Sequence, residues 1–211
     1  MRQEDRRALA RFGTSIVGDA LDRLNAIDGL QRFDGYCECV VGPALTVKTR
    51  EGDNLAVLHA ISIARPGDLL VIDGGGWMRR ALVGDLARAF AISRGVIGFV
   101  VDGALRDVDT FRSTEPFACF ARGTSPAGPF KDGPGRVNVP VAIGGQVVAA
   151  GDIVVADNDG IVSFAASMID TVVAAAHARV AAEGVIRRQI AQGEQQPWLA
   201  AMMENSGTKI S

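Results

Sequence analysis

The amino-acid sequence predicts a layered α/β protein. Helical and strand-like segments alternate in the first half of the chain, and short strand-like segments cluster in the second half. The 211 residues include 25 glycines and are 48% hydrophobic but only 6% aromatic, which is typical of a domain rich in small side chains and tight turns. We expect a single domain over residues 1–211, because this length can bury one large core.

Charge and hydropathy argue against several classes of protein. With 22 basic and 24 acidic residues, the net charge of −2 gives no electrostatic reason to expect binding to nucleic acid or to an anionic membrane. No apolar run approaches the roughly 20 residues of a membrane-spanning helix, and residues 1–7 lack the apolar core of a signal peptide. We therefore expect a cytoplasmic protein that binds neither nucleic acid nor membrane.

The cysteines and histidines do not indicate a site. Cys37, Cys39 and Cys119 follow no recognised spacing, which argues against a disulfide framework. His59 and His177 are the only histidines and both fall in predicted helices. A zinc site of the usual His/Cys kind and a Ser-His-Asp triad are therefore disfavoured.

The first 80 residues alternate between helix and strand signals. We expect two short helices over residues 3–24, broken at Gly13 and resumed with Thr14 or Ser15 as the N-cap. The segments that follow are a strand over Cys39–Thr49 bent at Gly42-Pro43, a helix over Asn54–Ala64, a buried strand over Asp68–Asp73, and a loop carrying Trp77, Arg79 and Arg80. Either arginine could contact a second substrate carboxylate, but we expect both to be solvated.

Gly74-Gly75-Gly76 suggests a phosphate-binding loop at first sight. It matches neither G-x-G-x-x-G nor Gly-Lys-Ser/Thr, so we do not expect a nucleotide site. We expect these glycines to let the backbone approach the site beside Asp85.

Residues 84–109 are the most informative stretch. Leu82, Leu86 and Ser93 recur at helical spacing, which predicts a helix that starts near Gly84 and stops at Gly95. The run Val96–Val101 then predicts a buried strand, followed by a turn at Asp102-Gly103. Asp85 would open the helix and Arg106-Asp107 would follow the strand, at the carboxyl edge where open α/β sheets bind ligands.

The second half predicts short strands and a helical tail. Residues 122–135 form a Gly/Pro-rich connection whose length suggests function or an intersubunit contact. Asp157 and Asp159 are interpreted as turn residues, because the loop and glutamate of an EF-hand are absent. The expected strands are Phe117–Ala121, Val137–Ile143, Gln146–Ala149, Asp152–Ala156 and Ile161–Phe164. A long helix over Ala166–Gln192 should follow, with a weak break at Gly184 and its end at Gly193. A short final helix is expected over Gln195–Asn205. Apolar positions in the tail, residues 166–211, suggest packing on a neighbouring subunit.

The polar residues of the 84–109 stretch suit the chemistry of an oxo acid. Asp107 is a hard oxygen ligand for Mg²⁺, and Asp85 could orient, or take a proton from, a metal-bound water. Arg106 can hold a carboxylate or a developing enolate oxygen, and the N–H groups of Leu86 and Ala87 can bind an anionic group at the helix start. The alternative is structural: a helix cap and a surface ion pair.

Asp85, twenty intervening residues and Arg106-Asp107 resemble the D-x20-R-D signature of the class II pyruvate aldolases of the RraA-like family. That family includes 4-hydroxy-4-methyl-2-oxoglutarate/4-carboxy-4-hydroxy-2-oxoadipate aldolases and proteins named regulator of ribonuclease activity A. The resemblance extends from about Ser15 to Gly160 and includes the runs at 67–76, 120–123 and 138–140.

The resemblance implies a three-layer β/β/α swivelling-domain fold, assembled as trimers or hexamers with the site between subunits. It implies a lyase dependent on Mg²⁺ or Mn²⁺ that cleaves 4-hydroxy-2-oxo acids, such as 4-hydroxy-4-methyl-2-oxoglutarate, to pyruvate. Oxaloacetate would be decarboxylated through the same enolate. Asp107 would hold the metal, Asp85 and Arg106 would be catalytic, and Gly84, Leu86, Ala87 and Arg106 would bind the small-molecule substrate.

Two departures from the family pattern concern the metal shell. An acid usually follows Arg-Asp after a few residues, but here Asp109 comes only two positions after Asp107 and Thr110 follows it. In relatives, an acid from the tail of the neighbouring subunit approaches the water bound to the metal. Glu183 is our first candidate for this acid, acting on the metal through that water, and Glu194 is the second.

Two other functions compete with the aldolase. A non-catalytic regulator that binds a ribonuclease or helicase would not need Asp85, Arg106 and Asp107 together, which favours the enzyme. A related lyase or hydratase acting on another oxo acid would carry the same residues.

Overall fold

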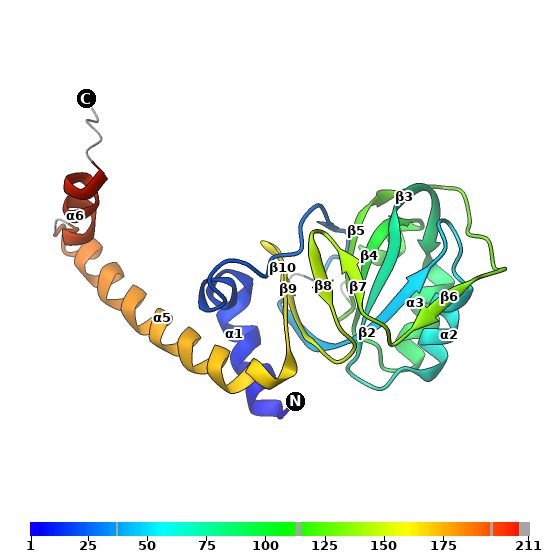
Figure 1. Ribbon diagram of the computed structural model, residues 1–211, viewed down its shortest axis with the longest axis horizontal. Coiled ribbons are helices and arrows are strands. Elements are labelled where there is room, and N and C mark those ends of the chain that lie inside the picture. The colour runs from blue at the N-terminus through cyan, green and yellow to red at the C-terminus, as the bar shows by residue number, and fades with distance from the viewer. Residues whose placement is uncertain (37, 113–114, 195, 207–211) are drawn as a thin grey trace.

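The structure is a computed structural model that describes residues 1–36, 38–112, 115–194 and 196–206. Figure 1 shows the order of the elements along the chain. The helices are α1 (Gln3–Ala20), α2 (Leu55–Ile63), α3 (Asp85–Ser93), α4 (Val108–Phe111), the 3₁₀ turn η1 (Ala166–Met168), α5 (Ile169–Ala191) and α6 (Pro197–Ser206). The strands are β1 (Gln31–Arg32), β2 (Val40–Thr49), β3 (Leu69–Val83), β4 (Gly98–Leu105), β5 (Ala118–Thr124), β6 (Gly135–Val137), β7 (Val141–Ile143), β8 (Gln146–Val148), β9 (Ile153–Asp157) and β10 (Gly160–Phe164).

An eight-stranded sheet in the order β1-β5-β4-β3-β2-β9-β10, with β6 beside β2, forms the centre of the molecule. Strands β2 to β5 are parallel, and α2, α3 and α4 connect them in turn. At Gly42-Pro43 the expected bend is present, because β2 pairs with β9 up to Pro43 and with β3 from Ala44. The predicted α/β class is confirmed.

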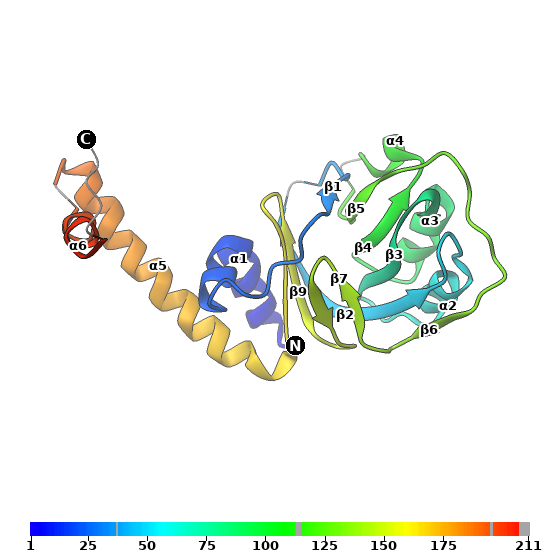
Figure 2. The same cartoon turned by 45° about the horizontal axis from the view of Figure 1, so that its top comes forward.

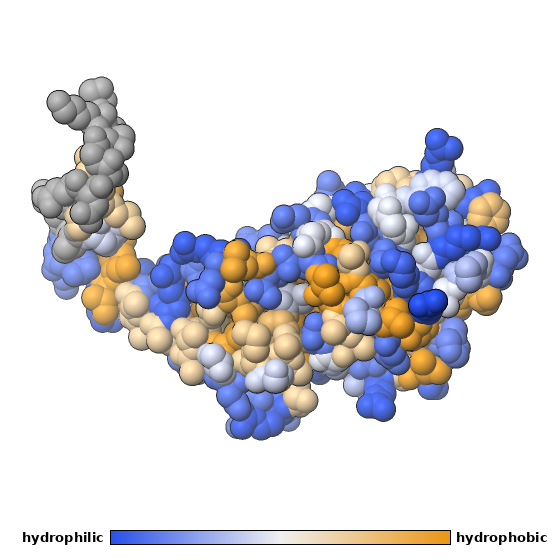
Figure 3. Space-filling model, in the orientation of Figure 1, coloured by the Kyte–Doolittle hydropathy of each residue, from blue (hydrophilic) through white to orange (hydrophobic). Residues whose placement is uncertain are grey.

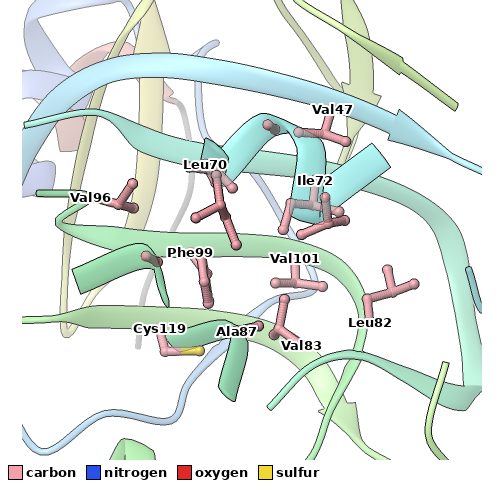
Figure 4. Packing of buried hydrophobic residues seen from close by; sticks show 14 of the residues in the cluster. Val47, Leu70, Ile72, Leu82, Val83, Ala87, Val96, Phe99, Val101 and Cys119 are labelled. Atoms are coloured by element: carbon pink, nitrogen blue, oxygen red, sulfur yellow. The ribbon is translucent and has the colours of Figure 1, made fainter. Parts of the chain in front are cut away.

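Alternating side chains of the parallel strands divide the core into two layers. Leu70, Ile72 and Phe99 pack with α2 and α3 on one face, as Figure 4 shows. Val71 and Val100 point to the other face, where the separate two-stranded sheet of β7 and β8 packs as a second β layer together with β9 and β10, which continue the central sheet beyond the bend in β2. The β/β/α arrangement is therefore confirmed. A third cluster packs α1 and the start of α5 on the outer face of β9 and β10, which adds a helical layer that the sequence did not predict (Figure 2).

Two central strands are longer than expected, and the predictions of a loop at 77–80 and a turn at Asp102-Gly103 were wrong. β3 continues to Val83 and β4 to Leu105, with Trp77 opposite Gly103 and Val83 opposite Leu105. The added part of β3 and the added part of β4 pair with each other through backbone hydrogen bonds, so residues that are typical of turns remain within the paired strands. Register shifts around Gly75 and Gly76, whose φ angles are 68° and 69°, accommodate the additional residues of β3.

Long-range contacts also changed other boundaries. The predicted strand over Val137–Ile143 is two strands, because the chain turns at Asn138, with φ of 58°, and Pro140 cannot donate to a ladder. The helix break at Gly13 is present, but Asp157 of β9 caps the second half of α1 by accepting from Thr14 N–H at 2.8 Å. Asp157 is therefore more than a turn residue.

The helical tail extends away from the domain on the side opposite α3 (Figures 1 and 2). α5 runs unbroken through Gly184, contrary to expectation, and the chain turns at Gly193 with φ of 71°. Val180, Val185 and Ile190 are exposed, and Figure 3 shows hydrophobic surface along α5. Packing of this tail on another subunit stays a prediction, and Gln195 and residues 207–211 lie outside the described residues. Within the described ranges, no helix combines the length and hydropathy needed to cross a membrane.

Candidate active site

The predicted acids and arginine meet where β3 and β4 end. β3 ends at Val83, and Asp85 opens α3 after the N-cap residue Gly84. β4 ends at Leu105, and the N–H group of Arg106 donates to Val83 O at 3.0 Å. This hydrogen bond joins the carboxyl ends of β3 and β4. The parallel pairing of the two strands therefore places Asp85, Arg106 and Asp107 at one edge of the sheet.

Asp107 lies directly at the N-terminus of α3. Its Oδ2 accepts from Asp85 N–H at 3.0 Å and lies 3.5 Å from Arg106 Nε. Asp107 has a left-handed φ of 59°, which few non-glycine residues adopt. The positive end of the α3 dipole and the Arg106 guanidinium both lie next to this side chain. Asp107 is therefore held in an unusual backbone conformation that turns its carboxylate toward α3.

Gly84 provides the space in which these side chains meet. A Cβ atom at Gly84 would lie 2.5 Å from Asp107 Oδ2 and 2.9 Å from Arg106 Cγ. The φ of −155° at Gly84 is an extended conformation that any residue can adopt. Glycine is required here because the side chains of Arg106 and Asp107 lie too close for a Cβ atom. Gly128 makes room in the same way, since a Cβ there would lie 2.8 Å from Arg106 Nη1.

The carboxylate of Asp85 is exposed and bonded to its own helix start. Asp85 Oδ1 accepts from Leu86 N–H at 2.7 Å. The expected anion site at Leu86 and Ala87 is thus partly occupied by Asp85.

A pocket of about 300 Å³ lies beside this cluster. Gly84, Asp85, Leu86, Ala87 and Arg106, which the sequence suggested as site residues, line it, whereas Asp107 lies behind them and is not part of the lining. Sequence reasoning missed the other lining residues, of which Asn54, Gly128 and Lys131 bring polar or space-making groups. All three come from segments that the sequence marks only as a helix start or a Gly/Pro-rich connection, and no local pattern distinguishes them.

Asn54 lines this pocket and has an unpaired side-chain acceptor. Its side-chain amide donates to Leu82 O at 3.0 Å instead of capping α2. Only 5% of the residue is exposed, and within the described part of the chain its Oδ1 has no hydrogen-bond partner. A buried acceptor without a donor is costly unless something binds it. Asn54 therefore keeps an unused buried acceptor beside the wall of the pocket.

The connection after β5 reaches the pocket because the buried carboxylate of Asp53 holds it. Asp53 accepts from the N–H groups of Asp132 at 2.8 Å and Gly133 at 2.9 Å, as well as from Leu55 and Arg50. Burial by itself would raise the pKa of Asp53, but these donors outweigh it and hold the pKa below its usual value.

Arg80 holds the same connection from the other side. Its Nη1 donates to Gly128 O at 2.7 Å, and its guanidinium lies 4.0 Å from the ring centroid of Phe130. The expectation that Arg80 is a solvated surface residue was therefore wrong, because the loop folds back over it. Arg79 is exposed, as expected.

We expect Asp53→Ala to lower the free energy of unfolding by about 2–4 kcal/mol, since several buried donors lose their acceptor. Asp132→Ala is the matched control: its carboxylate is 76% exposed and 3.8 Å from Arg50, so the loss should be under about 0.5 kcal/mol. Urea unfolding measures both. Because the folded pKa of Asp53 is lowered, its contribution is complete above the unfolded pKa of about 3.9 and is lost as the pH falls further. Equal stability of both variants would show that Asp53 does not anchor the loop.

Several other candidate residues lie away from this pocket. The Gly74–Gly76 glycines do not serve the Asp85 site as expected: a Cβ at Gly74 would meet Leu82, and one at Gly76 would meet Arg122. Asp109 is fully exposed beside Arg112 at 3.7 Å. Glu183 pairs with Arg179 and Arg187 on α5, and Glu194 is exposed after it, so neither reaches the site of its own chain.

The thiols and imidazoles take no part in the pocket. Burial raises the pKa of Cys39 to about 12 and that of Cys119 well above its usual value, so both thiols are inert at neutral pH. Cys37 lies outside the described residues. His59 is exposed on α2, and His177 packs edge-on against Phe12 at 4.8 Å.

The donors at the pocket fit a hard divalent cation. The described residues contain no group of three or more His, Cys, Asp or Glu side chains arranged as a metal site. Asp85 and Asp107 nevertheless bring two carboxylates to the start of α3, where the backbone N–H of Asp85 donates to Asp107 Oδ2. Mg²⁺ commonly uses one or two protein carboxylates and completes its shell with water and substrate, so the residues present fit Mg²⁺ or Mn²⁺.

Comparison with known proteins identifies the family. The family model RraA-like, described as Aldolase/RraA, matches residues 14–163. The chain belongs to the RraA-like family. A relative from Halalkalibacterium halodurans, provisionally named a 4-hydroxy-4-methyl-2-oxoglutarate aldolase, is 43% identical over 148 residues, which cover 70% of each chain. An Arabidopsis thaliana relative with the same provisional name, numbered 3, is 40% identical over 138 residues, 65% of this chain and 82% of its own.

Solved structures of this family extend the match to the tail. Streptomyces coelicolor RraAS2, titled an unusual member of the RNase ES inhibitor RraA family, superimposes with a TM-score of 0.79 at 28% identity and covers 89% of this chain and 97% of its own. The resemblance to the RraA-like family that residues 85–107 suggested is thus confirmed, and so is the fold it implied.

Proposed function

We propose that this protein is a divalent-metal-dependent lyase that cleaves 4-hydroxy-2-oxo acids, such as 4-hydroxy-4-methyl-2-oxoglutarate, to pyruvate. Oxaloacetate would lose CO₂ through the same pyruvate enolate. The observation that carries the proposal is the meeting of Asp85, Arg106 and Asp107 at the N-terminus of α3, beside a pocket. The names of the relatives agree with this chemistry.

Each residue has a task that its position supports. Arg106 borders the pocket with a side chain that is 39% exposed, and its planar fork can hold the oxygen that gains charge in the enolate. N–H groups at the start of α3 bind the carboxylate next to the 2-oxo group. Asp85 accepts the proton of the 4-hydroxyl group, directly or through water.

Asp107 would hold the metal, with Asp85 reaching it through water. Mg²⁺ or Mn²⁺, when bound, supplies Lewis-acid polarisation of the 2-oxo group. An acid from a neighbouring subunit in a trimer or hexamer would complete the shell, and Glu183 remains the first candidate, because α5 extends beyond its own domain. This role and the assembly are proposals.

A regulatory role is the second candidate, since RraAS2 is titled a member of an inhibitor family. A surface that only docks on a ribonuclease would need neither the left-handed backbone of Asp107 nor the space that Gly84 leaves for it. The chemistry of the pocket therefore favours the lyase.

Metal dependence tests the proposal directly. Purified protein with Mg²⁺ should release pyruvate from 4-hydroxy-4-methyl-2-oxoglutarate and from oxaloacetate, EDTA should abolish both reactions, and added Mg²⁺ or Mn²⁺ should restore them. Pyruvate is followed with a coupled dehydrogenase, and Zn²⁺ serves as the comparison metal. Full activity after exhaustive chelation would contradict the role of Asp107, and no pyruvate from either compound would contradict the lyase.

A further inference from the structure

Lys131 brings an unneutralised positive charge to the active-site pocket. It lines this pocket together with Arg106, and its side chain forms no ion pair or hydrogen bond with the rest of the described chain. Surface lysines are normally mobile and say little about function. Lys131 differs because the backbone on both sides of it is fixed.

Hydrogen bonds anchor the residues that flank Lys131. Phe130 N–H donates to Gly52 O at 2.8 Å, and Phe130 O accepts from Asn54 N–H at 3.0 Å. On the other side, the N–H groups of Asp132 and Gly133 are held by Asp53. Because the backbone on both sides is already fixed, Lys131 loses less conformational entropy on binding an anion than a lysine on a mobile loop would. The same contact therefore contributes more to the binding free energy.

The charges around the pocket are best balanced by a ligand with two negative charges. Asp85 and Asp107 balance the two charges of a divalent cation, and Arg106 and Lys131 then remain as two positive charges. Arg106 and the start of α3 face the carboxylate and 2-oxo end of the substrate. Arg80, the other nearby cation, is committed to Gly128 O and the Phe130 ring. Lys131 is left for a second carboxylate.

We propose that Lys131 binds the carboxylate that the substrate carries beyond the bond to be broken, and so selects dicarboxylic 4-hydroxy-2-oxo acids over monocarboxylic ones. This inference rests on the proposed function. Lys131 is a specificity residue in it, and neither the metal nor the reacting carbons need it.

Two inert ligands isolate this contact. 2-Oxoglutarate and 2-oxopentanoate share a five-carbon 2-oxo acid skeleton and differ only in the distal carboxylate, and neither has the 4-hydroxyl group required for cleavage. Calorimetry in Mg²⁺ gives their dissociation constants for the wild-type chain, Lys131→Met, Lys131→Arg and the control Arg136→Met. Arg136 is an exposed cation on β6 that does not line this pocket, so its loss changes net charge equally.

The wild-type chain and Arg136→Met should bind 2-oxoglutarate at least about fivefold more tightly than 2-oxopentanoate. Lys131→Met should reduce this preference to below about twofold with unchanged affinity for 2-oxopentanoate, and Lys131→Arg should keep most of it. A preference that survives in Lys131→Met, or that is absent from the wild-type chain while both ligands bind, overturns the assignment of Lys131 and leaves the oxo-acid site intact. Failure of both ligands to bind overturns the oxo-acid site itself, and the assignment of Lys131 with it.

Discussion

Asp107→Ala should weaken Mg²⁺ binding by more than about 100-fold and reduce kcat/KM by roughly 10³-fold or more. Loss of a residue behind a metal ligand commonly costs 10- to 100-fold, and loss of the ligand itself should cost more. Asp107 Oδ2 also accepts from Asp85 N–H, so Asp107→Asn, which keeps an acceptor there, separates the loss of charge from the loss of that bond. Metal titration by calorimetry and the pyruvate assay measure the two effects.

Two neighbouring acids provide the comparison for Asp107. Asp109→Ala removes a fully exposed carboxylate two residues away and should leave metal affinity and turnover unchanged. Asp85→Asn keeps the shape but loses basicity, so turnover should fall on the order of 10²-fold with a smaller change in metal affinity. If Asp107→Ala and Asp109→Ala bound Mg²⁺ equally well, the metal would have to lie elsewhere.

Arg106→Lys should reduce kcat by roughly 10²- to 10³-fold while KM changes by less than about tenfold. The ammonium keeps the charge but cannot reproduce the planar fork, and a group that meets charge developing in the transition state affects turnover more than substrate affinity. Aldol cleavage and oxaloacetate decarboxylation should fall in parallel, because both pass through the pyruvate enolate. Steady-state kinetics on both substrates measures this.

Arg112→Lys is the matched control for Arg106. Arg112 is 69% exposed beside Asp109 at the end of α4, outside the pocket, so both reactions should remain near wild type. A loss of only one reaction in Arg106→Lys would indicate that the arginine recognises that substrate and does not stabilise the shared enolate. Wild-type rates for both would remove Arg106 from catalysis.

The sequence alone determined the part of the site that lies along one continuous β–α–β unit. The helix that opens at Asp85 and the strand that precedes Arg106-Asp107 are both local patterns. A parallel pair with a connecting helix places their carboxyl ends together whatever the rest of the fold does. The D-x20-R-D spacing added the family, which a match over residues 14–163 confirms.

Only the tertiary structure decided what faces these residues. A hydrogen bond to Leu82 of the next strand holds Asn54 at the wall of the pocket. Lys131 reaches the pocket because Asp53, almost eighty positions earlier in the chain, holds its loop. The strand extensions through Asp102-Gly103 and the cap of α1 by Asp157 also depend on distant partners. Hydrogen bonds between segments far apart in the chain leave no periodicity in either segment. The sequence therefore determined which acids and arginine lie at the ends of β3 and β4, and the packing of distant loops decided the shape and charge of the pocket beside them.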